Sequence, residues 1–542
     1  MVHLQGALKV EYSKYSAFNA TQQMGQKTNN IVQVISFAIL SNSKIQTMPD
    51  SSYRKKWSEL KKENIRPENL VRLSRQIAYS FLDLYLKDCH YEKDFIDLLC
   101  EMMTFSTNPQ LNNPGTQALF EIIIERLCDD FETLQTETYN RVMTQVISFC
   151  RTIPEGSKLN NRLKKFRIHS DNEMLKRINS IRLNGKRLAD KGFIKKILIL
   201  SRVTIGADVA ITSIIIQRLT ELYPDAEIVL IGNSKLKEVY GANSNIRIEE
   251  ISYSRKGGLM PRLSSWHRVL EIIDQETSSV PEDNIALIDP DSRLSQLGVL
   301  PLVSENNYFF FDSRSDTSFN KKMSMVELTN KWLDDITDNM GFNFPKVWIP
   351  DEYLQISGKL FNDLRNSGAE NIIVANFGVG GNSRKSVGKN LEKKLLITLL
   401  QKPNTVILLD KGFGDREALS INALIAEIDK QGYPTRHTTF GSNKKELINW
   451  GVIGIESGIG EIAALIAMSG EFIGYDSACQ HISAALGTPC LTIFAGSNNM
   501  RFIRRWSAHG QNRCSIVHVD TLTDPRAVEV DDIITRIMQL RV

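Results

Sequence analysis

Four polar residues lie between two apolar segments near the end of the chain. The stretch FIGYDSACQHISAALGTPCLTIFAG reads as a buried strand, a polar turn, a short helix of small residues and a second buried strand. The turn and the first helical turn hold Asp476, Ser477, Gln480 and His481. Helix capping accounts for Asp476 and Ser477 but not for His481, which comes one turn later. We therefore predict a ligand site at the carboxyl end of this strand.

A glycine-rich turn with two cations follows another apolar strand. In NFGVGGNSRKSVGKN, Gly378 comes directly after the strand, and Arg384 and Lys385 precede a helix. Backbone N–H groups in such a turn can face a phosphate, and the two cations can neutralise it. A surface loop is the alternative interpretation. The dinucleotide-binding pattern fits only loosely, because Ser383 stands where that pattern has its third glycine.

Carboxylates occupy three further turns. LLDKGFGDREALSINAL places Asp415 and Glu417 at a helix start, where an acid can bond a ribose hydroxyl or simply cap the helix. Asp208, in TIGADVAIT, follows a buried strand and could accept a proton from a hydroxyl group or only begin a helix. Asp289 and Asp291 have a D-x-D spacing with a proline between them, and we expect no metal there.

The elements that must position these residues are alternating strands and helices. From Phe193 onward, apolar runs of strand length alternate with helical periodicity, which is typical of βαβ units and a parallel sheet. Two such series predict an α/β protein with two doubly wound, Rossmann-like domains, residues 193–345 and 346–542, that face a cleft. Residues 1–192 are predicted to form an all-helical domain, because apolar residues recur at three- and four-residue spacing from about residue 67.

Length and composition exclude several classes of protein. A chain of 542 residues is too long for one core, and 42% hydrophobic with 24% charged residues is ordinary for a globular protein. No apolar run approaches the roughly 18 residues of a membrane span, and the first residues do not resemble a secretory signal. The 7 scattered cysteines indicate reduced thiols in a cytoplasmic protein without a zinc site.

Residues 151–196 are strongly basic, with 14 Lys and Arg against 4 Asp and Glu. Such a segment is either a solvated helix and linker or a surface for an anionic partner. The second interpretation predicts peripheral contact with an anionic membrane surface at the inner face of the membrane, or with an acidic acceptor. No feature of the sequence indicates a nucleic-acid partner.

The C-terminal pattern resembles a known family. IGYDSACQHISAALGTPCLTIFAG, followed by RRWSAHG, is similar to the signature of the ADP-heptose:lipopolysaccharide heptosyltransferases, glycosyltransferase family nine. The resemblance extends over roughly residues 193–542, so the helical first third is an addition. It implies a GT-B fold, an inverting mechanism, no metal, no cofactor, and a nucleotide-sugar donor such as ADP-heptose held mainly by the C-terminal domain.

The resemblance also implies roles for individual residues. Asp208 matches the family's proposed base, and Asp415 or Glu417 its ribose-contacting acid. The residues implied around the donor diphosphate are Asp476, Ser477, His481, Lys385 and Arg384. If Asp208 only begins a helix, the base must be sought at Asp291 or His267.

Three departures from the family pattern point to a divergent branch. Ala207 separates the family's Gly-Asp pair, Ala478 replaces a glycine, and the segment after Trp506 lacks the family's proline. The expected activity is transfer of a sugar, with heptose as one candidate, to a glycan, a lipid-linked glycan or a protein. Two alternatives stay open: a sugar-nucleotide epimerase-type enzyme on the same fold, and a non-catalytic module that binds a nucleotide sugar and a protein partner.

Overall fold

The computed structural model divides the chain into two units, Met1–Ile65 and Arg66–Val542. In the first unit, the described element is helix α2 (Ser51–Leu60), and the helical domain predicted for residues 1–192 therefore begins outside the described residues. Among the described residues, no helix combines the length and apolar content needed to cross a membrane. The structure describes residues 51–62, 65–127, 131–183, 185–189, 192–253, 258–314, 322–442, 448–524 and 528–541.

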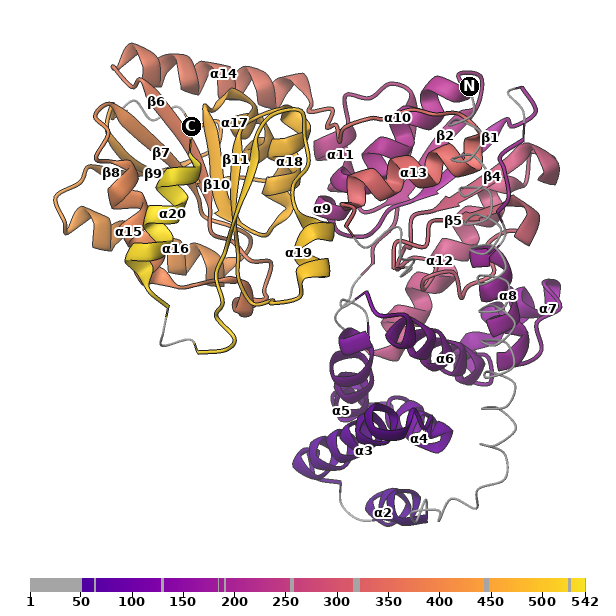
Figure 1. The fold of residues 1–542 in the computed structure, drawn as a ribbon. Helices are drawn as coiled ribbons and strands as arrows, with labels where there is room; N and C mark the ends of the chain where they lie inside the picture. Colours follow the sequence, from indigo (N-terminus) through magenta and orange to yellow (C-terminus); the bar gives the residue numbers. More distant parts are fainter. Residues whose placement is uncertain are drawn as a thin grey trace, which may run out of the picture. The chain divides into compact units, whose positions relative to one another are not determined.

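The second unit contains a parallel five-stranded sheet of order β3-β2-β1-β4-β5 (Figure 1). Its strands are β1 (Lys196–Leu200), β2 (Glu227–Gly232), β3 (Ile246–Glu250), β4 (Ile285–Asp289) and β5 (Tyr308–Phe310). The order reverses between β1 and β4, and ligands of doubly wound sheets bind at the carboxyl ends of strands at such a point. The connecting helices are α9 (Ile205–Ala207), α10 (Ser213–Leu222), α11 (Leu236–Tyr240), α12 (Leu259–Thr277) and α13 (Met325–Thr337).

A seven-stranded parallel sheet of order β12-β11-β10-β6-β7-β9-β8 follows (Figure 1). Its order reverses between β6 and β10. The two parallel sheets confirm the predicted α/β fold with two Rossmann-like halves. The strands are β6 (Asn371–Asn376), β7 (Thr405–Asp410), β8 (Thr435–Thr439), β9 (Gly451–Glu456), β10 (Glu471–Tyr475), β11 (Cys490–Phe494) and β12 (Cys514–His518).

Helices cover both faces of the second sheet, which is why its central strands are continuous apolar runs. Alternate residues of β6 point to opposite faces: Ile372 and Val374 join one core cluster, and Ile373 and Ala375 join the other. The helices of this half are α14 (Asp351–Asn366), α15 (Lys389–Leu399), α16 (Asp415–Asp429), α17 (Ile459–Met468), α18 (Ala478–Leu486), α19 (Met500–Trp506) and α20 (Val530–Leu540).

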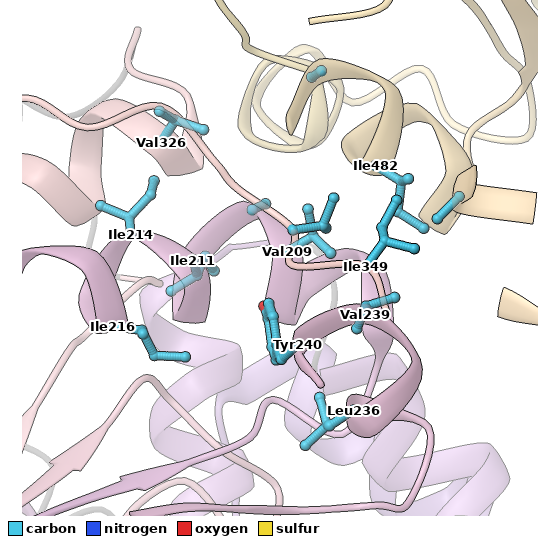
Figure 2. Packing of buried hydrophobic residues seen from close by; sticks show 14 of the residues in the cluster. Val209, Ile211, Ile214, Ile216, Leu236, Val239, Tyr240, Val326, Ile349 and Ile482 are labelled. Carbon is cyan, nitrogen blue, oxygen red and sulfur yellow. The ribbon is translucent and has the colours of Figure 1, made fainter. Parts of the chain in front are cut away.

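One apolar cluster continues from the first half into the second. Val209, at the start of the helix after β1, and Ile482 on α18 are both fully buried in it. Figure 2 shows these two side chains near Ile349, which lies on the segment between the halves. Burial of large aliphatic side chains stabilises by about 1.5–3 kcal/mol each, so this cluster holds the two halves together.

The helical segment that precedes the first sheet contains α3 (Pro67–Asp88), α4 (Lys93–Met102), α5 (Pro109–Gln117), α6 (Thr133–Cys150), α7 (Ser157–Lys165) and α8 (Asp171–Leu183). Residues 106–116 are polar and contain two prolines, yet α5 lies there. The Asn108 side chain caps α5, and Pro109 takes its first position, where a missing N–H costs nothing. A π-helical segment, Ala118–Ile124, then continues it.

The basic segment 151–196 is folded partly inward. Arg162 and Arg177 are buried, and their guanidinium groups donate to backbone carbonyls of residues 298–303. Arg162 also pairs with Asp274 on α12. These bonds tie α7 and α8 to the loop between β4 and β5. Part of the positive charge counted in the sequence therefore serves packing and is not displayed to a partner.

Candidate functional site

An ion pair lies where the order of the second sheet reverses. Lys385 follows β6 and Asp476 follows β10, and the Lys385 Nζ lies 2.6 Å from the Asp476 Oδ2. The Gln480 amide donates to the other carboxylate oxygen at 2.6 Å. Parallel neighbours end at the same sheet edge, so the topology joins residues 91 positions apart in sequence. Asp476 thus orients an ammonium group whose side chain is 27% exposed.

The start of α18 adjoins this ion pair. Ser477 is the N-cap residue of α18, but its side chain makes no capping bond. Its hydroxyl oxygen is buried and has no hydrogen-bond partner among the described residues. A helix N-terminus carries partial positive charge, and buried polar atoms normally have partners. The ion pair, the helix start and the unsatisfied hydroxyl together indicate a site for an anionic group.

His481 lies one turn into α18 and is buried. Burial lowers the pKa of His481 to about 4, with the Asp476 carboxylate opposing the shift. Its ring meets the Trp506 ring edge to face, with centroids 6.1 Å apart. At neutral pH the imidazole is therefore uncharged. The sequence suggested His481 as a group that offsets the charge of a leaving diphosphate; in this structure it can offer a hydrogen bond but no net charge.

Glu417 fastens two loops at the carboxyl edge of the second sheet. Its carboxylate accepts from the backbone N–H groups of Val379 and Gly380 at 3.0 and 3.1 Å, and from that of Phe413 at 2.8 Å. Gly378 lies against it, since a Cβ at Gly378 would be 2.8 Å from the Glu417 Oε2. Glu417 is thus engaged by the protein itself.

Asp415 and Arg384 are the exposed members of the predicted site. Asp415 occupies the first position of α16, so its carboxylate faces solvent near the loops that Glu417 fastens. Of the two acids proposed for ribose contact, Asp415 is the more accessible. Arg384 lies in the short 3-10 turn Ser383–Lys385, and its carbonyl oxygen packs on Gly496 after β11.

Asp410 was not predicted as a site residue, although it ends β7 at the same edge. Its carboxylate accepts from the Asn376 amide at 2.5 Å, the Ser457 hydroxyl at 2.8 Å and the Gly412 N–H at 3.2 Å. Burial raises the pKa of Asp410 to about 6. An apolar strand that ends in Asp was the available signal, and its function here is to join the ends of neighbouring strands.

Asp208 lies in the first half and is completely buried. Its carboxylate accepts from the Ser201 hydroxyl and the Arg202 N–H at 2.7 Å, and from the Thr212 hydroxyl at 2.9 Å. Burial raises the pKa of Asp208 to about 6. The sequence suggested a carboxylate that could accept a proton from a hydroxyl group; the structure encloses this carboxylate, and its pKa lies above the ordinary value near 4.

A π-helical turn explains how the chain accommodates Ala207. The segment Asp208–Thr212 is π-helical, and the Ser213 N–H donates to the Asp208 carbonyl five residues back. One extra residue in a helix is often absorbed as a single π turn. The inserted alanine therefore leaves the rest of α10 in its helical register.

The glycine before this turn brings the two halves into contact. A Cβ on Gly206 would lie 3.1 Å from the Ala478 Cα and 3.2 Å from the His481 Cδ2. Gly206 therefore packs directly on the first turn of α18, beside the Lys385–Asp476 pair. The turn that carries Asp208 and the helix that carries His481 are neighbours in the structure.

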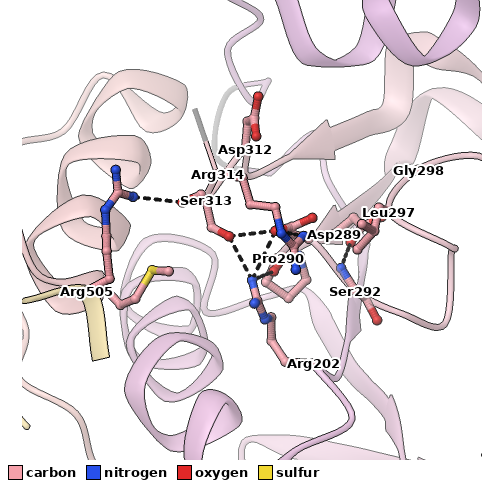
Figure 3. Close-up of polar contacts among 12 residues, drawn as sticks. Arg202, Asp289, Pro290, Ser292, Leu297, Gly298, Asp312, Ser313, Arg314 and Arg505 are labelled. Atoms are coloured by element: carbon pink, nitrogen blue, oxygen red, sulfur yellow. Dashed lines mark hydrogen bonds and ion pairs between the residues drawn. The ribbon is translucent and has the colours of Figure 1, made fainter. Parts of the chain in front are cut away.

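A second ion pair lies where the order of the first sheet reverses. Arg202 follows β1 and Asp291 follows β4, with 3.5 Å between the Arg202 Nη1 and the Asp291 Oδ2. The Arg314 guanidinium and the Ser313 hydroxyl bond the same oxygen at 2.5 and 2.6 Å. Figure 3 shows Arg202, Ser313 and Arg314 converging, with Arg505 of the second half donating to the Ser313 carbonyl. Sequence reasoning missed the three arginines.

The two other acids considered from the sequence differ in their surroundings. Asp289 accepts from the Ser292 N–H, the Ser295 hydroxyl and the Tyr308 hydroxyl at 2.5–2.7 Å, so the protein saturates it. In contrast, the Asp291 Oδ1 is buried with no partner among the described residues. Within the described part of the chain, no group of three or more His, Cys, Asp or Glu could hold a metal ion.

His267, the other alternative base, lies on α12 rather than at the end of a strand. Burial lowers its pKa, and Lys158 and Glu271 are its charged neighbours. These neighbours belong to α7 and α12. His267 is therefore separated from the groups that converge at the ends of the strands.

The segment that carries α18 and Arg505 has a recognisable family pattern. Residues 450–524 match the model of glycosyltransferase family 9 (heptosyltransferase). This part of the chain is similar to glycosyltransferase family 9. The match spans β9 to β12 and therefore contains Asp476, Ser477, His481 and Trp506. The match confirms the resemblance to this family that the sequence analysis found in this segment.

Solved structures with similar chain traces include a glycosyl transferase of family 9 and two heptosyltransferases. The family 9 protein of Veillonella parvula DSM 2008 has a TM-score of 0.47 at 14% identity, covering 66% of this chain and 98% of its own. The Escherichia coli heptosyltransferase WaaC with ADP has a TM-score of 0.44 at 10% identity, covering 64% and 100%. The E. coli ADP-heptose lps heptosyltransferase II has a TM-score of 0.43 at 11% identity, covering 64% and 98%. No curated protein matches this sequence.

Proposed function

We propose that this protein is a glycosyltransferase that moves a sugar from a nucleotide diphosphate donor to an acceptor hydroxyl. The observation that carries the proposal is the Lys385–Asp476 pair beside the start of α18. Asp476 and α18 lie inside the segment that matches the family 9 model. A sugar nucleotide presents a diphosphate, and this place offers an ammonium group, a helix N-terminus and the unsatisfied Ser477 hydroxyl.

The proposed reaction inverts the anomeric carbon. The acceptor oxygen attacks that carbon while its bond to the diphosphate oxygen breaks, and the acceptor proton passes to a carboxylate. Charge develops on the departing diphosphate, where Lys385 and the N–H groups of α18 offset it. Asp476 would repel a phosphate, so its part in the proposal is to orient Lys385 and Gln480.

Asp208 is the proposed base. Its turn contacts α18 through Gly206, and a carboxylate whose pKa is raised to about 6 is well suited to accept a proton at neutral pH. Because the carboxylate is enclosed, the turn of residues 201–207 has to open for an acceptor. Asp291, whose second oxygen lacks a partner among the described residues, is the other candidate.

The proposal does not need a metal ion or a resident cofactor. Lys385 and α18 supply the positive charge that a divalent cation would otherwise provide at the diphosphate. The donor is a nucleotide sugar, with ADP-heptose the first to test because of the family 9 segment. The acceptor would be a glycan, a lipid-linked glycan or a protein. Peripheral contact with an anionic membrane would use basic side chains of residues 151–196 that stay exposed, such as Lys164 and Lys165.

The test is a thermal-stability screen of the full chain against nucleoside diphosphates and their sugars. A ligand at about 100 times its dissociation constant adds about 2.7 kcal/mol to the free energy of unfolding, which raises Tm measurably. Stabilisation by a nucleoside diphosphate, and release of that diphosphate from its sugar when acceptor is present, are the expected results. A chain that no nucleotide stabilises would contradict the proposal.

The same assay separates the two alternatives. An epimerase-type enzyme would convert the donor sugar without an acceptor. A non-catalytic binding module would be stabilised by the nucleotide sugar but would neither convert nor hydrolyse it.

A further inference from the structure

We propose that Phe131, a residue of the helical segment before the first sheet, positions the donor site by supporting α19. The proposal rests on the proposed function, because it concerns the site assigned above to the donor diphosphate. Phe131 immediately precedes Glu132, the N-cap residue of α6, and is 4% exposed. The family 9 segment does not include it.

The Phe131 ring meets two aromatic rings of α19. Its centroid lies 6.4 Å from that of Phe502 and 6.4 Å from that of Trp506, each at an interplanar angle of 47°. Aromatic pairs at such distances stabilise a structure beyond the effect of their buried area. One side chain of the helical segment thus contacts both aromatic residues of a helix that lies more than 360 positions later.

The same two aromatic residues contact the candidate donor site. The Lys385 ammonium lies 6.0 Å from the Phe502 ring centroid, and the His481 ring lies 6.1 Å from that of Trp506. Phe131 is therefore one contact away from both residues. A shift of α19 would remove the aromatic neighbours that hold the ammonium group and the imidazole in place.

The backbone of Phe131 is fixed as firmly as its ring. Its φ is 56°, a left-handed conformation that bulky residues rarely adopt and that persists only where surrounding contacts enforce it. The Arg501 guanidinium donates to the Phe131 carbonyl at 2.6 Å, and the Arg505 guanidinium lies 5.4 Å from the ring centroid. Both arginines belong to α19, so this helix engages Phe131 from two sides.

These contacts give the helical segment a function different from the one expected from the sequence. From the sequence, the basic residues 151–196 at the end of this segment were interpreted as a surface for an acceptor or a membrane. Phe131 instead makes part of that segment a support of the donor site. We therefore expect a chain without residues 1–192 to lose donor affinity, and a point substitution tests this without removing a domain.

The experiment compares three variants of the full chain in calorimetric titrations with ADP, or with the nucleoside diphosphate that stabilises the wild type best. Phe131→Ala removes both ring contacts, and Phe131→Leu keeps most of the apolar volume. Phe81→Ala is the matched control: Phe81 is also buried in the helical segment and also has two aromatic neighbours, Tyr85 and Tyr91, but both lie within that segment. We expect the dissociation constant to rise about tenfold in Phe131→Ala, about threefold in Phe131→Leu and not at all in Phe81→Ala.

Hydrogen exchange of the α19 amides in the same variants gives a second readout. Faster exchange over residues 500–506 in both Phe131 variants but not in Phe81→Ala would support positioning, because a general loss of stability would also affect the control. Unchanged ADP affinity in a folded Phe131→Leu or Phe131→Ala would overturn the inference alone. A wild type that binds no nucleotide would overturn the proposed function and this inference with it.

Discussion

At the scale of single residues, the enclosed carboxylate of Asp208 gives the sharpest test of the proposed base. A base must be ionised, and burial raises the pKa of Asp208 to about 6. Turnover should therefore be lost as the pH falls through about 6, rather than near 4 as for an ordinary aspartate. Asp208→Asn keeps the shape but removes the basicity, so turnover should fall by about 100-fold or more with donor affinity nearly unchanged.

Thr212→Val is the companion variant for the pH profile. It removes a hydrogen bond to the ionised carboxylate at 2.9 Å, which raises the pKa of Asp208 further. The acidic limb of the turnover profile should therefore move to higher pH. A limb that stays in place, or near-normal turnover in Asp208→Asn, would reduce Asp208 to a structural residue and direct the search to Asp291.

Lys385 is the residue on which donor affinity should depend most. Lys385→Ala removes the ammonium group proposed for the diphosphate and leaves Asp476 without its cation, so affinity for ADP should fall at least about tenfold. Lys393→Ala is the control, because Lys393 pairs with Glu427 at 3.1 Å on the outside of the same half. Equal ADP affinities in the two variants, measured by titration calorimetry, would show that Lys385 does not contribute to donor binding.

At the scale of elements, the contact between Gly206 and α18 leaves little space for a larger side chain at position 206. In Gly206→Ala, the new Cβ would lie 3.1 Å from the Ala478 Cα, and a backbone atom cannot move aside as a flexible side chain can. We expect the helix to shift, with a loss of about 1–3 kcal/mol in the free energy of unfolding and weaker donor binding.

Gly358→Ala is expected to change the stability of the protein in the opposite direction from Gly206→Ala. Gly358 lies inside α14, and a Cβ there would meet nothing within 4 Å. Alanine should therefore stabilise this helix by about 0.5–1 kcal/mol. Chemical denaturation of both variants shows whether each substitution raises or lowers the free energy of unfolding. A neutral or stabilising Gly206→Ala would mean that the two halves are not in tight contact at this point.

The sequence predicted the strands of both sheets and most of the helices, but not the contacts between them. Apolar runs and helical periodicity predicted both parallel sheets, and the turn after β10 was predicted as a site from Asp476, Ser477 and His481. The Arg202–Asp291 pair was not predicted, because nothing in the sequence says that β1 and β4 are neighbours. Periodicity also does not distinguish a basic residue that faces solvent from one, such as Arg177, that donates to buried carbonyls.

At the scale of the whole molecule, we predict that activity survives removal of divalent metal ions. The acids with D-x-D spacing are engaged by the protein: Asp289 by two hydroxyls and an N–H, and Asp291 by two guanidinium groups and a hydroxyl. Transfer measured in EDTA should match transfer in magnesium. Activity that EDTA abolishes and that magnesium or manganese restores would require a metal site that the described residues do not show.

The order of strands in the second sheet has a consequence for how the protein is made. The central strand β6 has β10 as one neighbour, with Glu471 opposite Ile373, so these two strands cannot pair until the ribosome has synthesised β10. Contacts between residues so far apart form slowly and leave unpaired strand edges exposed meanwhile. Lys385 therefore has no Asp476 partner until residue 476 has been synthesised. A nascent chain that stalls before residue 476 would have a completed first sheet but would lack the proposed nucleotide site. Nucleotide-dependent protection of stalled chains of increasing length should accordingly appear abruptly, once β10 and α18 have left the exit tunnel.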